Sequence, residues 1–168
     1  MLKNDLERIY DEQAEALFVC ALAVTRCRAS AEDAIQDAFG RLLTLDRRPE
    51  DLRVYVFRCV RNAAIDIQRR ARRVAEMHAD AAVPAEAWIF AVDPARQAGD
   101  GEFAEQAAAA LRTLSDDERE TIVQHLYAGL TFREIGQVRE TPTNTVASWY
   151  RRGLGKLREQ LESHNGQL

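Results

Sequence analysis

The sequence has little glycine and proline, eight and four residues of 168, and it lacks extended runs of β-branched residues. Both shortages disfavour an all-β fold and a doubly wound parallel sheet. No apolar run approaches the roughly 20 residues that span a bilayer. The N-terminal stretch MLKNDLERIYDEQ lacks the apolar segment of a signal peptide, so we expect a cytoplasmic protein.

Cysteine is also scarce, and its odd count of three argues against a disulfide scaffold. Cys20 and Cys27 are seven positions apart, which predicts one shared helix face, where filling the core is a commoner role than binding metal. The motifs GxxxxGK[ST], GxSxG, HExxH and Cys-x-x-Cys are absent, and the three histidines are scattered. We therefore expect no enzymatic activity, no cofactor and no metal.

Apolar residues at helical spacing occupy most of the first half of the chain. They recur over about 5–27, 31–45 and 52–67, which predicts three helices packed as a bundle. Ser30, with Asp33 three positions later, predicts the N-cap of the second helix. This part of the chain therefore indicates a compact helical domain.

The middle of the chain differs in composition from both ends. Residues 76–102 hold six acidic side chains against one arginine and show poor periodicity, which predicts a linker. The predicted fold is thus all-α, with two small helical domains over 1–75 and 103–168. The apolar cluster from Trp88 to Phe90 is expected to dock on the protein itself, with docking on a partner as the alternative.

Charge is unevenly distributed along the chain. The formal net charge of −4 conceals two basic segments: 47–73 has nine arginines against three acids, and 139–158 has five basic residues against one acid. Basic segments on helices are a feature of nucleic-acid-binding proteins. A solvated face with salt bridges explains the charge equally well.

The last third of the chain carries the most specific local pattern. Capping boxes beginning at Ser115 and Thr131 predict two helix starts. The first of these helices is expected to bury Ile122, Val123, Leu126 and Tyr127, and to stop near Gly129. A turn over 139–141 follows, with Thr141 as the cap of a longer helix whose first residue is Pro142. This order is typical of a helix-turn-helix, with an ordinary helical hairpin as the alternative.

Three segments together resemble bacterial extracytoplasmic-function (group IV) sigma factors. "SAEDAIQDAFGRLL" at 30–43 is similar to the polymerase-binding helix of that family, and "LRVYVFRCVRNAAIDIQRR" at 52–70 to its promoter-melting segment. Residues 114–161 are similar to its C-terminal domain. The resemblance implies sigma regions 2 and 4, RNA polymerase core and promoter DNA as partners, and an anti-sigma factor as a candidate partner. A stand-alone helix-turn-helix regulator is the alternative.

The resemblance also implies site residues. Polymerase binding maps to three residues whose spacing places them on one helix face: Asp33, Gln36 and Asp37. Contact with the −10 element maps to Arg58, Arg61, Asn62, Arg69 and Arg70. Contact with the −35 element maps to Thr143, Asn144, Ser148, Arg151 and Arg152.

The chain departs from the family pattern within the helix-turn-helix. Glu140 replaces the common turn glycine, which disfavours a positive φ and adds negative charge near DNA. Ala147 and Trp149 replace a lysine and an arginine, so we expect weaker or altered −35 binding. Trp149 has an alternative role in packing under the preceding helix.

Overall fold

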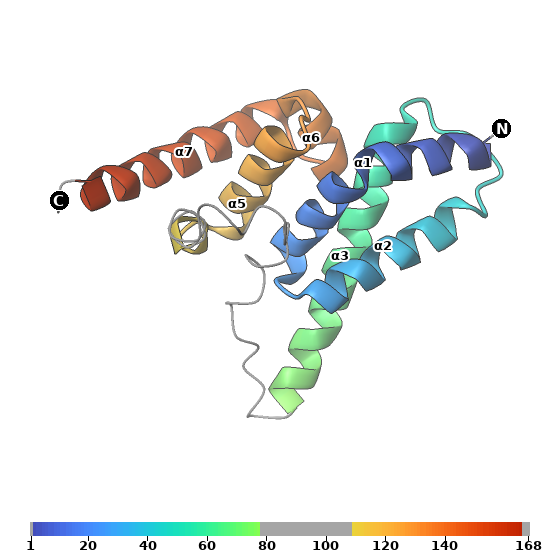
Figure 1. The fold of residues 1–168 in the computed structure, drawn as a ribbon, viewed down its shortest axis with the longest axis horizontal. Helices are drawn as coiled ribbons and strands as arrows, with labels where there is room; N and C mark the ends of the chain where they lie inside the picture. Colours follow the sequence, from blue (N-terminus) through green and yellow to red (C-terminus); the bar gives the residue numbers. More distant parts are fainter. Residues whose placement is uncertain (1, 78–108, 166–168) are drawn as a thin grey trace.

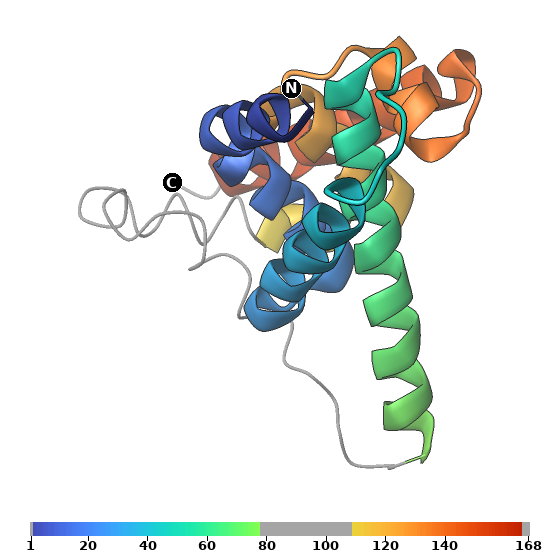
Figure 2. The same ribbon diagram turned by 90° about the vertical axis from the view of Figure 1, so that its right-hand side faces the viewer.

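The computed structural model describes residues 2–77 and 109–165, and every element assigned within them is helical (Figures 1 and 2). This confirms the all-α prediction. The elements are α1 (Leu2–Thr25), α2 (Arg28–Leu42), α3 (Leu52–Met77), α5 (Asp116–Ile122), the π-helical segment η2 (Val123–Tyr127), α6 (Phe132–Arg139) and α7 (Thr143–Asn165). Among the described residues, no helix has both the length and the apolar character needed to cross a membrane.

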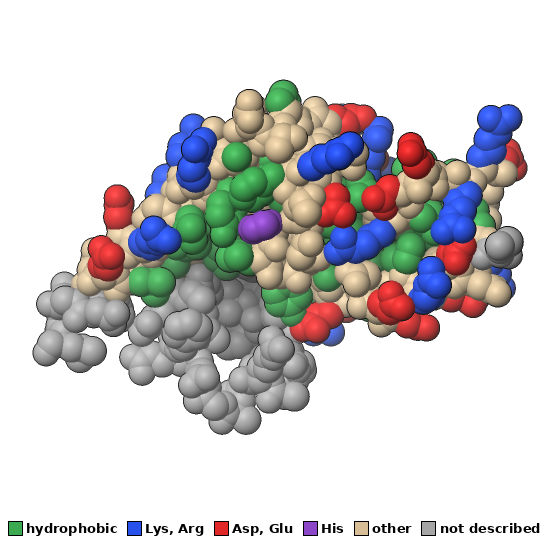
Figure 3. Space-filling view, turned by 90° about the horizontal axis from the view of Figure 1, so that it is seen from above, with side chains coloured by type: hydrophobic (Ala, Val, Ile, Leu, Met, Phe, Trp, Pro, Cys, Tyr) green, Lys and Arg blue, Asp and Glu red, His purple; other side chains and the backbone are tan. Residues whose placement is uncertain are grey.

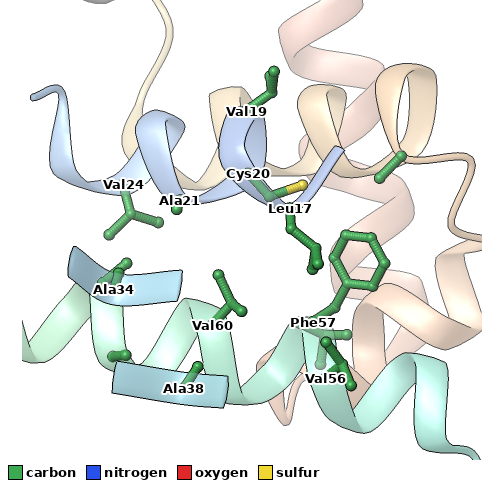
Figure 4. Close-up of a cluster of buried hydrophobic side chains, with 14 of the residues drawn as sticks. Leu17, Val19, Cys20, Ala21, Val24, Ala34, Ala38, Val56, Phe57 and Val60 are labelled. Carbon is green, nitrogen blue, oxygen red and sulfur yellow. The ribbon is translucent and has the colours of Figure 1, made fainter. Parts of the chain in front are cut away.

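Helices α1, α2 and α3 form the first bundle. Figure 4 shows Leu17 and Cys20 of α1 directed toward Phe57 and Val60 of α3. The buried positions of α2 that contribute to this core are small apart from one leucine: Ala31, Ala34, Ala38 and Leu42. Small side chains let helix backbones approach closely, so α2 packs tightly against both of its neighbours.

The connection between α1 and α2 differs from the prediction. Helix α2 begins at Arg28 with Cys27 at its N-cap, so the prediction of a Ser30 cap is wrong. The reason is Arg26, which adopts a left-handed φ of 54° and reverses the chain before Ser30 is reached. Cys27 therefore lies beyond α1, and the predicted helix face shared with Cys20 does not exist.

The two cysteines at this corner have different environments. Cys20 is buried, and desolvation raises the pKa of its thiol to about 12. Cys27 is partly exposed, and a hydrogen bond with the Ser30 side chain lowers the pKa of its thiol. Ser30, in the first turn of α2, thus contacts the side chain of the N-cap residue Cys27 instead of capping the helix itself.

The second unit consists of α5, η2, α6 and α7. Both predicted capping boxes are present, at Ser115 and at Thr131, and Gly129 adopts a left-handed φ of 66° after η2. Leu126 and Tyr127 are exposed, however, contrary to the prediction. The π-helical segment η2 explains this, because a wider turn rotates later residues away from the face that an α-helix would bury.

The start of α7 also differs in detail from the prediction. The helix begins at Thr143, one residue after Pro142. The Thr141 hydroxyl donates a hydrogen bond to the Arg139 carbonyl oxygen at 3.1 Å, so it satisfies the end of α6 instead of capping α7.

The two units pack against each other. Helix α3 contacts α6, and α1 contacts both α5 and η2. Buried side chains of α1–α3 and of residues 123–146 form a single hydrophobic cluster. The predicted linker over 76–102, with its apolar cluster from Trp88 to Phe90, lies outside the described residues except for its first two positions.

Candidate polymerase and nucleic-acid interface

The three residues expected to bind polymerase lie on the outer face of α2. Asp33, Gln36 and Asp37 are all exposed, as their spacing predicts. They line one shallow hollow together with Ile67 and Arg70 of α3. An arginine expected to contact DNA therefore lies beside the acidic face expected to contact polymerase.

The residues of α3 expected to contact the −10 element separate into two groups. Asn62, Arg69 and Arg70 are exposed, and the C-terminal half of α3 projects away from the rest of the molecule in Figure 2. Arg58 and Arg61 instead point toward the second unit. The Arg58 guanidinium lies 2.5 Å from a Glu140 carboxylate oxygen, and Arg61 Nε lies 2.6 Å from Glu120 Oε2.

Glu120 belongs to a buried ionic cluster between the units. Its side chain is 8% exposed, and that of Arg139 is only 3% exposed. Arg139 donates to the Thr121 hydroxyl at 2.9 Å, forms an ion pair with Asp117, and places Nε 3.8 Å from Glu120. Burial lowers the pKa of Arg139, yet a guanidinium remains protonated in proteins, so the cluster keeps its charges.

Arg139 also explains the position of Trp149. The guanidinium carbon lies 4.3 Å from the centre of the indole ring, within the range of a cation–π contact. Trp149 is half-buried against the core, so the packing role considered for it from the sequence is the observed one. Arg139 was predicted to lie in the turn over 139–141, whereas it is the buried last residue of α6.

A second buried arginine, Arg119, links α5 to the end of α1 by hydrogen bonding. The Arg119 side chain is 2% exposed, and it donates to the carbonyl oxygens of Ala23 and Leu114. It also forms an ion pair with Asp116, which Arg26 contacts at 2.7 Å. Burial alone would raise the pKa of Asp116, but these two arginines hold it below its ordinary value. No local pattern in the sequence predicted this contact.

The outer surface of α7 carries the residues expected to contact the −35 element. Thr143, Asn144, Arg151 and Arg152 are exposed. Ser148 is half-buried and donates to the Asn144 carbonyl oxygen at 3.0 Å. In Figure 3, basic and acidic side chains are mixed over the right-hand part of the face shown, and hydrophobic side chains occupy much of its middle.

The turn before α7 is tightly constrained. Glu140 adopts φ 53° and ψ 45°, the left-handed conformation for which its side chain is poorly suited. Thr141 N–H donates to the Gly136 carbonyl oxygen at 2.9 Å. A Cβ on Gly136 would lie 2.7 Å from the Thr141 carbonyl oxygen, so this close approach requires glycine.

Two family models account for most of this architecture. Residues 9–74 match sigma-70 region 2, and residues 110–159 match sigma-70 region 4. The chain belongs to the sigma-70 family. It is therefore an RNA polymerase sigma factor, with regions 2 and 4 in the order of the extracytoplasmic-function group. Sigma factors serve transcription initiation without being enzymes.

Among solved structures, the sigma factor is similar to RpoE from Bartonella quintana, crystallised in complex with the anti-sigma factor NepR. The identity is 22%, the TM-score is 0.77, and the match covers 94% of this chain and 97% of that one. A comparison with curated proteins finds no match. At this identity the structural likeness supports the fold, while the region 2 and region 4 matches establish the family.

Proposed function

We propose that this sigma factor binds core RNA polymerase through the outer face of α2 and contacts promoter DNA through α3 and α7. The observation that supports the polymerase site is the exposed group of Asp33, Gln36 and Asp37 on the helix that resembles the family's docking helix. Carboxylates on such a face pair favourably with arginines of a partner. The site of action is the cytoplasm, and the subunit works by binding alone.

The −10 contacts are assigned to Arg58, Arg61, Asn62, Arg69 and Arg70. Exposed arginines on the projecting end of α3 are suited to gripping phosphates of a melted strand. The −35 contacts are assigned to Thr143, Asn144, Ser148, Arg151 and Arg152. Asn144, Ser148 and Arg151 follow one another at helical spacing, so they present one face of α7 to the major groove.

Charge reversal on α2 tests the polymerase site. Asp33→Lys combined with Asp37→Lys should weaken binding to core polymerase by about 2–5 kcal/mol, because like charges replace buried pairs at the interface. Competition against a labelled sigma factor for core polymerase measures this change. Glu7→Lys combined with Asp11→Lys is the matched control, since both positions are exposed acids four residues apart on α1.

Equal core affinity for the α2 and α1 double variants would contradict the polymerase site. Binding to core polymerase also tests the alternative of a stand-alone regulator. Such a regulator would not comigrate with core polymerase, and it would bind promoter duplex tightly by itself. By analogy with the structure that contains NepR, we include an anti-sigma factor among the proposed partners.

A further inference from the structure

Arg139, the last residue of α6, connects the helices of region 4. Its terminal nitrogen atoms donate to the Asp117 carbonyl oxygen at 3.1 Å and to the Thr121 hydroxyl at 2.9 Å, and they form an ion pair with the Asp117 carboxylate. The same guanidinium lies over the indole ring of Trp149 on α7, with its carbon 4.3 Å from the ring centre. One side chain of α6 thus binds α5 and supports α7.

The stack at Trp149 stands next to a point where α7 and α5 approach closely. Trp149 and Gly153 are four positions apart, so they lie on one face of α7. A Cβ on Gly153 would lie 2.7 Å from Ile122 Cδ1, so no side chain separates the two helices there. Four residues earlier, the indole and the guanidinium together lie between α7 and the α5 residues Asp117 and Thr121. The thickness of this stack therefore sets the tilt of α7 against α5.

The residues expected to contact the −35 element lie beyond the stack, toward the start of α7. Asn144 is nine positions before Gly153 and Trp149 is four, which corresponds to roughly 13 Å and 6 Å along the helix. A change of ~1 Å in the separation at Trp149 would therefore move Asn144 by roughly 2 Å. Recognition groups need to be held within about 0.5 Å of their working geometry. The stack is thus placed to control which base edges α7 reaches.

We infer that Arg139 and Trp149 are positioning residues for promoter recognition, because their stack sets the tilt of α7 and thereby the −35 sequence that this chain prefers. Arg139 acts through α7, since its own side chain is only 3% exposed. Trp149 stands where the family pattern has an arginine, so a residue that would contact DNA is exchanged for one that positions the helix. The inference rests on the proposed contact between α7 and the −35 element.

The test measures the −35 preference of the holoenzyme, formed from core polymerase and the full-length chain. A duplex library is randomised in the −10 and −35 elements, and sequencing of bound and unbound DNA gives the ratio of preferred to average −35 sequences. Trp149→Leu removes the ring and should lower this preference ratio about tenfold, the scale of one well-placed base contact. Trp149→Phe keeps a ring over the guanidinium and should stay near the native ratio.

Trp149→Arg distinguishes positioning from the simple loss of a DNA contact. It restores the residue of the family pattern, but it places a second guanidinium beside that of Arg139, where like charges repel. This variant should lower the preference ratio as Trp149→Leu does. A ratio above the native one would show that the indole only replaces a contact, and the positioning role would be overturned.

Arg139→Lys tests the other partner of the stack. Lysine keeps the buried charge and loses the planar group that lies over the ring, so the preference ratio should fall about tenfold as well. Circular dichroism and binding to core polymerase check that each variant is folded. If Trp149→Leu does not fold, the result for Arg139→Lys decides in its place.

A control on the same helix separates positioning from a general loss of stability. Leu157 is a half-buried residue of α7 on the other side of Gly153 from the stack. Leu157→Ala should lower the midpoint of urea unfolding and leave the preference ratio unchanged. A fall in the ratio as large as that of Trp149→Leu would show that the ratio follows stability alone, and would overturn the inference.

Asn144→Ala separates this inference from the proposed −35 contact. If Asn144→Ala lowers the preference ratio while Trp149→Leu and Arg139→Lys do not, the positioning role is overturned and the contact stands. If none of the three changes the ratio, both are overturned. A lower ratio in all three supports both, and a lower ratio only in the two stack variants supports the positioning role and removes Asn144 from the contact surface.

Discussion

At the scale of single residues, Glu140 is placed at a backbone position that suits glycine. Its left-handed φ of 53° ends α6 and orients the chain toward α7. The same residue contacts Arg58, so a conformational cost and an ionic contact coincide at one position. An L-residue with a Cβ loses roughly 1–2 kcal/mol in this conformation relative to a right-handed one. The exposed ion pair with Arg58 stabilises the folded state by less than this conformational cost.

Glu140→Gly should therefore raise the free energy of unfolding by about 1 kcal/mol, because glycine adopts this conformation without steric cost. Urea denaturation followed by circular dichroism measures the change. Glu140→Gln is the control, since it removes the charge and keeps the Cβ, and it should bring no gain. A loss of stability in the glycine variant would show that the contact with Arg58 outweighs the backbone strain.

At the scale of helices, the packing of α5 against α7 depends on a missing side chain. A Cβ on Gly153 would lie 2.7 Å from Ile122 Cδ1 and 3.2 Å from Glu118 Cβ. A Cβ on Gly155, two residues later on α7, would have no neighbouring atom within 4 Å. The two glycines share a helix and differ in their surroundings, so they form an internal comparison.

Gly153→Ala should destabilise the protein, since overpacking costs about 1–3 kcal/mol and exceeds the helix-propensity gain of ~1 kcal/mol. Gly155→Ala should stabilise it by up to ~1 kcal/mol, because only the propensity term applies there. Thermal unfolding of both variants gives the comparison. Equal effects of the two substitutions would contradict the tight α5–α7 contact.

The same helix pair is joined by a buried carboxylate. Glu118 accepts hydrogen bonds from Lys156 Nζ, at 2.7 Å to one oxygen, and from Ser115 N–H at 3.1 Å. Burial alone would raise the pKa of Glu118, but the Lys156 and Ser115 contacts hold it below its ordinary value. The folded state thus binds a proton at Glu118 less readily than the unfolded chain does.

A carboxylate whose pKa is lower in the folded protein stabilises the fold. This stabilisation is fully present at pH values above the pKa of a glutamate in the unfolded chain, about 4.3, and it is lost as the pH falls through the pKa in the folded protein. Glu118→Gln should therefore be less stable than the native protein at neutral pH by about 1.5–3 kcal/mol. This difference should shrink in acid. Urea midpoints across the pH range measure it, with the exposed Glu159→Gln as control. A difference independent of pH would contradict the assignment.

At the scale of the whole molecule, regions 2 and 4 share one hydrophobic cluster and several buried ionic contacts. Two domains joined only by a linker unfold independently, whereas a shared core couples them. Calorimetry of the native protein should show one transition, and the variant with Glu120→Gln and Glu140→Gln should show two. Two separate transitions in the native protein would contradict the coupling.

The sequence predicted features that depend on neighbouring residues. The capping boxes at Ser115 and Thr131 and the exposed α2 face of Asp33 are set by spacings of three or four positions. Buried Arg119 was missed because its carbonyl partner Ala23 is 96 positions away, and no local pattern carries that information. Exposed Leu126 was missed because one π-helical turn changes the rotation per residue, which a fixed helical period does not represent.

The two arginine–carboxylate pairs, Arg58–Glu140 and Arg61–Glu120, differ in burial, and they should therefore respond differently to added salt. Added salt screens the exposed Arg58–Glu140 pair, which favours release of Arg58, but it also competes with DNA phosphates for the released arginine. The Arg61–Glu120 pair lies beyond the reach of those ions while the regions stay packed. The two effects oppose each other, so the affinity of the free protein for DNA should fall with salt less steeply than that of the variant with Glu120→Gln and Glu140→Gln.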